Sequence, residues 1–599
     1  MASSLLSSEG SLAPPAVLKE DRPDGSFVLR SPQRLQPYAR CIGDWLDHWA
    51  SITPDAVFLA ERGPDGAWRR LSYAQVREQV GRVAQGLLAL DLPEGKPVVV
   101  VSDNAIEHAL LLLAAAYVGR PNCTISSAYI RLTRDWTKVH GMLDMLDPAL
   151  VYASDAAVYG PALAQWTGRA PRVFGRGARD VPGALGFESL QSATEGPEVA
   201  RLAAAVRPDT HAKYLLTSGS TGVPKAVINT HRMLCANQQQ IAQVWPFLLR
   251  ERLVLLEWLP WSHTFGANHN FNMVLAHGGS LYIDEGRPAP GLIEKTLANL
   301  REIQPNFHFN VPRGFDMLLP FLEQDAQAAR EVFERLDGIF YAGAALPQST
   351  WERLEKVVRG VRERPVWFTS AWGSTETSPS VTCVHWPIER AGCIGLPMPG
   401  SEVKFVPNAD KFEIRVRGPQ VFPGYRNAPE LTAQAFDEEG YYRIGDAGRL
   451  VDPQDPAQGI AFDGRVAEDF KLTTGTWVSV GSLRLKAVSS MAPYVADAVV
   501  TGHDRSEIGL LLFLSPQGRQ APRDEVQARV LEALRAMRAT GGGSSQCPAR
   551  ALVLEDAPVM EAGEITDKGY INQRAVLGRR AADVAALHSA TPDPRVIAL

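Results

Sequence analysis

The sequence is poor in features that would tie it to an extracellular or nucleic-acid setting. Only six of its 599 residues are cysteine, and they are scattered without a C-x-x-C pair. That spacing argues against a disulfide framework or a zinc site and predicts reduced thiols in a cytoplasmic protein. Basic residues are not in excess, because 61 Lys and Arg face 66 Asp and Glu and give a net charge of −5. We therefore expect no nucleic-acid partner.

Long hydrophobic runs are also missing. The longest strongly apolar stretch, Ala109 to Val118, is far too short to span a bilayer and is predicted to form a buried helix. The N-terminus has no basic start followed by an apolar core, so we expect neither a signal peptide nor a membrane partner. Residues 1–36 are rich in Ser, Pro and charge and are predicted to be a loosely held tail.

Length and patterning predict a layered protein of more than one domain. A chain of 599 residues is too long for one compact core. Hydrophobic residues make up 45% and charged residues 21%, which is typical of a globular protein. Buried-strand patterns at 96–101, 149–153 and 253–256 alternate with helical patterns such as 104–118. This alternation predicts α/β layers.

Residues 213–228 (KYLLTSGSTGVPKAVI) join two β-like runs through a loop of small and hydroxyl residues. Glycines allow close backbone approach, successive N–H groups form an anion-binding concavity, and Lys225 adds a charge suited to phosphate. The loop differs from a Walker loop, because Val-Pro-Lys follows Gly222. An ordinary Gly/Ser turn is the alternative for this loop alone. The predicted polyphosphate loop consists of Thr217, Ser218, Gly219, Ser220, Thr221, Gly222 and Lys225.

Further segments carry residue types suited to nucleotide and acid chemistry. Taken singly, each also fits a plain structural role, as core aromatics, a capping carboxylate, a turn or a surface lysine. The histidines of segment 259–273 are not expected to form a metal site, because no carboxylate or cysteine lies nearby to complete a ligand set. The segments are LPWSHTFGANHNFNM (259–273), TSAWGSTETSPS (369–380), YYRIGDAGRL (441–450), FDGRVAEDFKL (462–472) and GEITDKGYINQR (563–574).

Lys568 in the last segment is the single lysine among eleven arginines between residues 487 and 599. A lysine retained where arginine is otherwise used suggests that a compact ammonium is needed at this position.

In their order along the chain, these segments resemble the motifs of the adenylate-forming superfamily. That superfamily holds acyl-CoA synthetases, firefly luciferase and the adenylation domains of peptide synthetases. Stretches such as AWGSTET and GRVAEDFKLTTGTWVSVG are closer still to bacterial feruloyl-CoA synthetases. The resemblance covers essentially the whole chain after about residue 40. It implies an α/β fold with a large N-terminal adenylation domain, 1–466, and a small mobile C-terminal α+β domain, 467–599, with the active site between them.

The resemblance also implies roles for nucleotide-binding residues. Thr375 would hydrogen-bond the α-phosphate, and Glu376 would hold Mg²⁺, a hard ion that prefers carboxylate and phosphate oxygens. Asp446 would accept both ribose hydroxyls, and Lys568 would be the adenylation lysine. Trp372 would stack on adenine. The remaining ATP- and AMP-binding residues would be Gly343, Ala344, Gly373 and Arg465.

An acyl pocket, a CoA channel and a hinge are implied in the same way. His263 would lie near the substrate carboxylate as a catalytic and pocket residue. The hinge would be Ala467 or Glu468, since the superfamily usually has Asp or Lys where Ala467 stands. Two smaller departures are Ile444 in place of Thr and Asp567-Lys568 in place of Gly-Lys. The other pocket walls would be Phe265, Phe309 and Ala371, and the CoA channel would include Gly475 and Trp477.

The implied activity is ATP-dependent conversion of ferulate, or a related hydroxycinnamate, to its CoA thioester through an acyl-adenylate, with release of AMP and pyrophosphate. ATP, Mg²⁺ and CoA would take part, the partners would be small molecules, and the protein would be a cytoplasmic monomer or homodimer. The alternatives are a CoA ligase for another aromatic or fatty acid, a catalytically silent binding protein, and an adenylation domain serving a carrier protein. The intact set of Thr375, Glu376, Asp446, Arg465 and Lys568 argues against a silent homologue.

Overall fold

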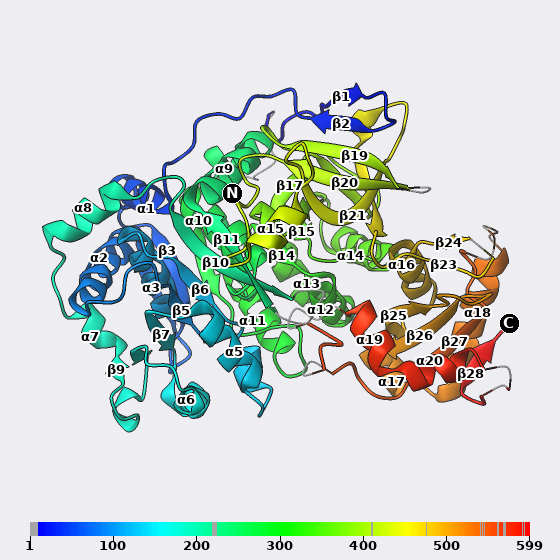
Figure 1. Cartoon of the computed structure of the whole chain (residues 1–599). Helices are drawn as coiled ribbons and strands as arrows, with labels where there is room; N and C mark the ends of the chain where they lie inside the picture. Colours follow the sequence, from blue (N-terminus) through cyan, green and yellow to red (C-terminus); the bar gives the residue numbers. More distant parts are fainter. Residues whose placement is uncertain are drawn as a thin grey trace.

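The protein has a large lobe built on three sheets and a smaller lobe formed by its C-terminal residues (Figure 1). This arrangement confirms the predicted α/β body with a small C-terminal α+β domain. The computed structural model describes residues 10–218, 224–408, 411–474, 476–539, 541, 543, 545–559, 562–566, 571–589, 591 and 593–599.

A seven-stranded sheet carries the predicted phosphate loop. Its strand order is β11-β10-β6-β5-β7-β8-β9, parallel except where β11 runs antiparallel to β10. The register pairs Thr217 with Lys225, so the two loop flanks stand opposite each other. The strands are β5 (Val98–Val100), β6 (Asn122–Thr124), β7 (Leu150–Ala153), β8 (Arg172–Phe174), β9 (Leu185–Gly186), β10 (His211–Ser218) and β11 (Pro224–Thr230).

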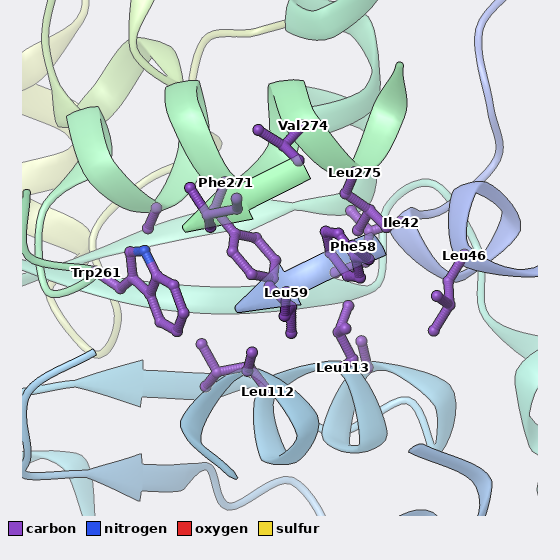
Figure 2. Packing of buried hydrophobic residues seen from close by; sticks show 14 of the residues in the cluster. Ile42, Leu46, Phe58, Leu59, Leu112, Leu113, Trp261, Phe271, Val274 and Leu275 are labelled. Atoms are coloured by element: carbon purple, nitrogen blue, oxygen red, sulfur yellow. The ribbon is translucent and has the colours of Figure 1, made fainter. Parts of the chain in front are cut away.

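The predicted buried helix is α3 (Ile106–Tyr117), which lies between this sheet and a four-stranded one. Figure 2 shows Leu112 and Leu113 of α3 facing Leu59 and Phe58, with the ring of Trp261 continuing the same apolar layer. Helix α2 (Tyr73–Ala89) packs beside α3. The second sheet has the order β12 (Val254–Glu257), β13 (Ser280–Ile283), β3 (Val57–Arg62) and β4 (Trp68–Ser72).

An eleven-stranded sheet, in the order β1-β2-β19-β20-β21-β22-β18-β17-β16-β15-β14, carries the remaining motifs of the large lobe. Only β14, β15 and β16 are parallel to one another. The strands not described elsewhere are β14 (Phe307–Asn310), β15 (Gly338–Tyr341), β16 (Trp367–Gly373), β17 (Ser380–Cys383), β18 (Cys393–Pro397), β20 (Lys411–Arg417), β21 (Tyr442–Leu450) and β22 (Ile460–Arg465).

The first two strands of this sheet correct the prediction of a loose N-terminal tail. Strands β1 (Leu18–Asp21) and β2 (Phe27–Arg30) form a hairpin, and β2 pairs antiparallel with β19 (Glu402–Asn408). The Phe27 ring stacks on Phe405 with centroids 4.4 Å apart. Apolar residues of β2 thus reach a core that the local composition does not reveal.

The small lobe packs helices on both faces of a four-stranded sheet, with α19 (Gln573–Arg579) and α20 (Ala581–Leu587) on one of them. Helices α16 (Val480–Ser490) and α18 (Arg523–Ala539) cover the sheet, and a short hairpin of β23 (Phe470–Lys471) and β24 (Trp477–Val478) precedes it. The domain boundary at 466/467 stays a prediction, although it falls between β22 and β23. The sheet order is β25 (Val495–Thr501), β26 (Gly509–Leu514), β27 (Arg550–Leu554) and β28 (Val596–Ala598).

Candidate active site

The carboxyl ends of β15 and β16 place the predicted adenine and phosphate residues side by side. Gly343 and Ala344 follow β15 in an exposed turn, where Gly343 has φ of +86°. Gly373 ends β16, and a Cβ there would lie 1.8 Å from the Pro379 carbonyl oxygen. Only glycine therefore fits at the point where β16 turns into the short helix that contains Thr375 and Glu376.

Glu376 is buried and reaches across to the phosphate-loop hairpin through Tyr425. The Tyr425 hydroxyl donates a 3.1 Å hydrogen bond to Glu376 Oε1. The Lys225 ammonium stands 5.0 Å from the centre of the Tyr425 ring. Burial and the Glu376 carboxylate raise the pKa of Tyr425, so the hydroxyl keeps its proton. Sequence patterns did not point to Tyr425, because 49 residues separate it from Glu376.

Asp446 is buried and has one oxygen held and one open. The Trp372 indole N–H donates to Asp446 Oδ2 at 2.8 Å. Oδ1 lies 3.3 Å from Arg465 Nε but accepts no hydrogen bond from the described residues. Burial raises the pKa of Asp446, while the Arg465 charge and the indole hydrogen bond oppose that rise. An acid with a buried open acceptor fits a hydroxyl-rich ligand such as ribose.

Several predicted residues lie outside the described part of the chain. They are Gly219, Ser220, Thr221, Gly222, Gly475 and Lys568, together with the side chain of Ser218. Of the phosphate loop, the structure therefore places the flanks, Thr217 and Lys225.

His263 and Thr217 line a small cavity of about 50 Å³ next to the phosphate loop. The chain then forms a π-helix, Phe265–Phe271. A Cβ on Gly266 would lie 2.5 Å from the Leu259 carbonyl oxygen, so this helix can pack closely on the segment before it only with glycine there. π-Helical turns occur often at functional sites.

An aromatic cluster surrounds His269, which the π-helix buries. Its ring centroid lies 4.9 Å from Phe340, 5.5 Å from Phe309 and 5.8 Å from Phe265. Burial lowers the pKa of His269 to about 4, so the ring is neutral at pH 7. Phe265 and Phe309 thus lie in one aromatic cluster, and half-buried Ala371 packs at the edge of the same core. Their role as walls of the acyl pocket stays a prediction.

A buried hydrogen-bond chain fixes this histidine. His269 Nδ1 and Asn270 Oδ1 are 2.8 Å apart, and Asn270 Nδ2 donates to Glu257 at the end of β12. Glu257 also accepts from the Leu259 N–H at 2.6 Å. Burial raises the pKa of Glu257 to about 8, so it is mostly protonated at pH 7.

The predicted hinge residues lie between β22 and β23, and the predicted channel residue Trp477 lies in β24. Glu468 lies in a turn, and its backbone N–H donates to the Arg465 carbonyl oxygen at 3.1 Å. Burial raises its pKa, and the charges of Arg465 and Arg484 oppose this rise. Ala467 precedes it in the same turn. Trp477 in β24 has the Lys471 ammonium 5.0 Å from its ring centre.

The donor set of this site fits a magnesium ion shared with phosphates. No group of three or more His, Cys, Asp or Glu side chains in the described ranges could hold a metal by itself. Mg²⁺ is usually bound by one or two carboxylates with phosphate oxygens and water. Glu376 has Oε1 held by Tyr425, whereas Oε2 has no hydrogen-bond partner among the described residues.

Family comparison agrees with this geometry. Residues 46–426 match the AMP-binding enzyme family, and residues 473–591 match the AMP-binding enzyme C-terminal domain. The chain belongs to the AMP-binding enzyme family. This places it in the superfamily of adenylate-forming acyl- and aryl-CoA ligases.

Similar members of the AMP-binding family come from bacteria and plants. The long-chain-fatty-acid–CoA ligase FadD15 of Mycobacterium bovis is 26% identical over 511 residues, 78% of this chain and 80% of that protein. The 4-coumarate-CoA ligase 1 of Narcissus pseudonarcissus is 25% identical over 478 residues, 77% and 82% of the two chains.

A solved structure, the anthranilate CoA ligase AuaEII with anthranoyl-AMP, has a TM-score of 0.74 at 18% identity and covers 91% of this chain and 98% of its own. ATP-bound MatB from Rhodopseudomonas palustris has a TM-score of 0.70 at 21% identity, over 90% and 99%. At these identities the two structures show a shared fold. No helix in the described residues of this family member is both long and apolar enough to cross a membrane.

Proposed function

We propose that the protein is an ATP-dependent acid–thiol ligase that converts ferulate and related hydroxycinnamates to CoA thioesters. The observation that carries this choice of acid is the set of flat rings around His269, in the π-helix that follows His263 along the chain. Such faces suit an aryl acid, because aromatic pairs gain stability beyond buried area alone. Similarity to a 4-coumarate-CoA ligase over most of the chain supports the same choice.

In the first step, a carboxylate oxygen of the acid attacks the α-phosphorus of ATP, and the bond from that phosphorus to the β-phosphate oxygen breaks. Pyrophosphate leaves and an acyl-adenylate forms. The loop at 217–225 and Lys568 would bind the phosphates, Thr375 would donate to the α-phosphate, and Asp446 would hold the ribose. Positioned donors of this kind stabilise developing charge. Mg²⁺ held by Glu376 would offset phosphate charge when bound.

In the second step, the CoA sulfur attacks the acyl carbon, the thiol proton goes to solvent, and AMP leaves with the electrons of the C–O bond. We propose that the small lobe turns about Ala467 or Glu468 between the steps, bringing Gly475 and Trp477 to the thiol channel. A rotation of this kind would gate the reaction without changing its chemistry. In the proposed enzyme His263 borders the reacting carboxylate.

A substrate panel tests the proposal. Purified protein, ATP, Mg²⁺ and CoA are combined with ferulate, coumarate, benzoate or octanoate, and thioester absorbance is followed. The highest kcat/KM is expected for ferulate or coumarate. A higher kcat/KM for benzoate or octanoate would remove hydroxycinnamates as the substrate class.

A long-chain fatty acid is the second candidate substrate, because FadD15 is as similar in sequence as the coumarate ligase. Palmitate in the same panel decides between them. A fatty-acid enzyme would prefer palmitate, and Phe265→Leu would lower its kcat/KM only slightly. In an aryl-acid enzyme the same change would remove a stacking surface and lower kcat/KM for the aryl acid.

A further inference from the structure

A second cavity, of about 420 Å³, lies beside the small cavity that His263 lines. Residues after β5, β6, β12 and β13 form its walls, so it stands at the carboxyl ends of strands from two sheets. Thr124, Ser126 and Ser262 line both cavities. Ligands of open parallel sheets bind at this end of the strands. The shared wall brings the larger cavity next to the proposed reaction centre.

Four carboxylates of the cavity wall already have protein donors. Asp103 is held by Ser127 and Arg131. Asp284 accepts hydrogen bonds of 2.7 to 3.0 Å from three neighbours. Glu61 accepts from a backbone N–H at 2.8 Å and from Arg69, and Glu285 accepts from the Asn299 amide at 3.1 Å. Because these acids are satisfied, they do not require a bound cation.

Five wall residues carry donor groups that lack partners within the described residues. Arg287 and Lys295 form no ion pair or hydrogen bond through their side chains. The hydroxyls of Ser102 and Ser262 and the indole N–H of Trp261 are buried without a partner, in residues that are 3%, 5% and 2% exposed. Burial and the nearby Arg131 charge lower the pKa of Arg287.

Trp261 cannot turn to find another acceptor, because its ring packs against His108 and Phe271, with ring centroids 5.0 Å and 4.9 Å away. Figure 2 shows the rings of Trp261 and Phe271 next to each other. Buried polar groups in native proteins are nearly always hydrogen-bonded. Unpaired donors beside an unpaired guanidinium are therefore best satisfied by an anion with several acceptor oxygens, which guanidinium groups bind strongly.

We propose that this cavity binds a diphosphate group, an inference that rests on the proposed ligase function. Two molecules of that reaction carry one: the pyrophosphate released in the first step and the CoA consumed in the second. Both present phosphate oxygens to Arg287, Lys295 and the buried hydroxyls. A volume of about 420 Å³ lies within the usual range for small-molecule sites, roughly 300–1,000 Å³.

Direct binding is the first test. Inorganic pyrophosphate is titrated calorimetrically into the full-length wild type, Arg287→Gln and the control Arg359→Gln, whose side chain is 74% exposed on α14 (Gln348–Val361). Two sites are expected in the wild type and the control, one at the phosphate loop and one in the cavity. Arg287→Gln should weaken one of them by about tenfold or more, as expected for loss of a charge-assisted contact. Equal titrations for all three proteins would overturn the proposal.

Kinetics then separate the two sources. If CoA occupies the cavity, Arg287→Gln should raise KM for CoA by about tenfold and leave KM unchanged for pantetheine, which lacks the diphosphate. If pyrophosphate occupies it, the variant should instead raise KM for pyrophosphate in ATP–pyrophosphate exchange. Equal losses with CoA and pantetheine would show a merely structural role and overturn the site. Failure of the wild type to form thioester from any acid would overturn the ligase function, while the titrations would still test the cavity.

Discussion

At the scale of single residues, Asp446 illustrates how a carboxylate is prepared for a ligand. Its two oxygens have different surroundings, because Trp372 fixes Oδ2 and leaves Oδ1 open beside Arg465. Trp372 therefore acts as a positioning residue in the structure, whereas its stacking on adenine stays a prediction.

Replacing Trp372 with Phe should keep the ring and remove the hydrogen bond to Asp446. We expect KM for ATP to rise about tenfold, or roughly 1.4 kcal/mol, in ATP–pyrophosphate exchange. Trp367→Phe is the matched control, because Trp367 lies on the same strand and donates at 3.2 Å to the Trp386 carbonyl oxygen instead. Equal KM values for the two variants would contradict the positioning role.

Glu376→Gln keeps the shape of the side chain and removes its charge. We expect adenylation to fall on the order of 10²-fold, the loss typical of one electrostatic stabiliser. The variant should also require more Mg²⁺, since an amide oxygen binds that hard ion more weakly than a carboxylate. Near-normal turnover of Glu376→Gln at limiting Mg²⁺ would rule out the metal-binding role.

At the scale of elements, the π-helix Phe265–Phe271 is held to β12 by the Asn270–Glu257 hydrogen bond. Asn270→Ala would remove the partners of two buried polar atoms, Glu257 Oε2 and His269 Nδ1. We expect a loss of about 2–4 kcal/mol in the free energy of unfolding and a higher KM for the acid.

Asn272→Ala provides the control for that change. Asn272 follows the same helix and is buried, but its amide has no partner in the described residues. Its removal should cost much less stability, as measured by thermal unfolding. A larger loss for Asn272→Ala than for Asn270→Ala would show that the hydrogen-bond chain does not hold the helix.

Elements set by local pattern were predictable, and elements set by distant contacts were not. The helix at 106–117 and the two strands around the phosphate loop follow from apolar runs and glycine placement. The π-helix does not, because nothing in FGANHNF separates π from α geometry. Its shape depends on distant partners, such as Gln238 Nε2, which donates to the Asn268 carbonyl oxygen at 2.9 Å.

The candidate site shows the same division. The family resemblance implied that Asp446 and Arg465 both bind the nucleotide, and the structure pairs them on neighbouring strands. The indole of Trp372 was placed near the nucleotide, but its bond to Asp446 joins residues 74 positions apart. A hydrogen bond between strands of one sheet depends on their register, which single motifs do not contain.

At the scale of the whole molecule, the two lobes predict separable half-reactions. Lys568→Ala should lose acyl-AMP formation by about 10²–10³-fold yet convert premade feruloyl-AMP and CoA to thioester. A bulky change at Gly475 should do the reverse, because glycine allows close approach of the pantetheine arm. The readouts are pyrophosphate release and thioester formation from synthetic adenylate. Equal loss of both steps in Lys568→Ala, with the fold intact, would contradict a rotating small lobe.

Acid should destabilise the whole fold. Burial lowers the pKa of six histidines to about 4, whereas an unfolded histidine titrates near 6.5. The unfolded chain therefore binds more protons between these values, and stability that is full above pH 6.5 is lost as pH falls toward 4. Each site contributes up to roughly 1.4 kcal/mol per pH unit. The histidines are His108, His231, His269, His277, His308 and His588.

Apparent Tm measured from pH 7.5 to 5 checks this expectation. His277→Leu should make the fall in Tm shallower, because its Nε2 is buried without a partner in the described structure. His503→Gln should leave the slope unchanged, since that side chain is 71% exposed. A Tm that rises on acidification would contradict the assignment.

The hairpin of β1 and β2 has a consequence for synthesis on the ribosome. Strand β2 ends at Arg30, and its neighbour β19 begins at Glu402. At roughly 5–20 residues per second, β2 emerges about 20–75 s before its partner is translated. During that interval the apolar side chains of Phe27, Val28 and Leu29 belong to an unfinished sheet. The nascent chain therefore exposes the β19-facing edge of β2 for most of its translation, although β1 can pair with the other edge. This edge is where we expect chaperones to bind first.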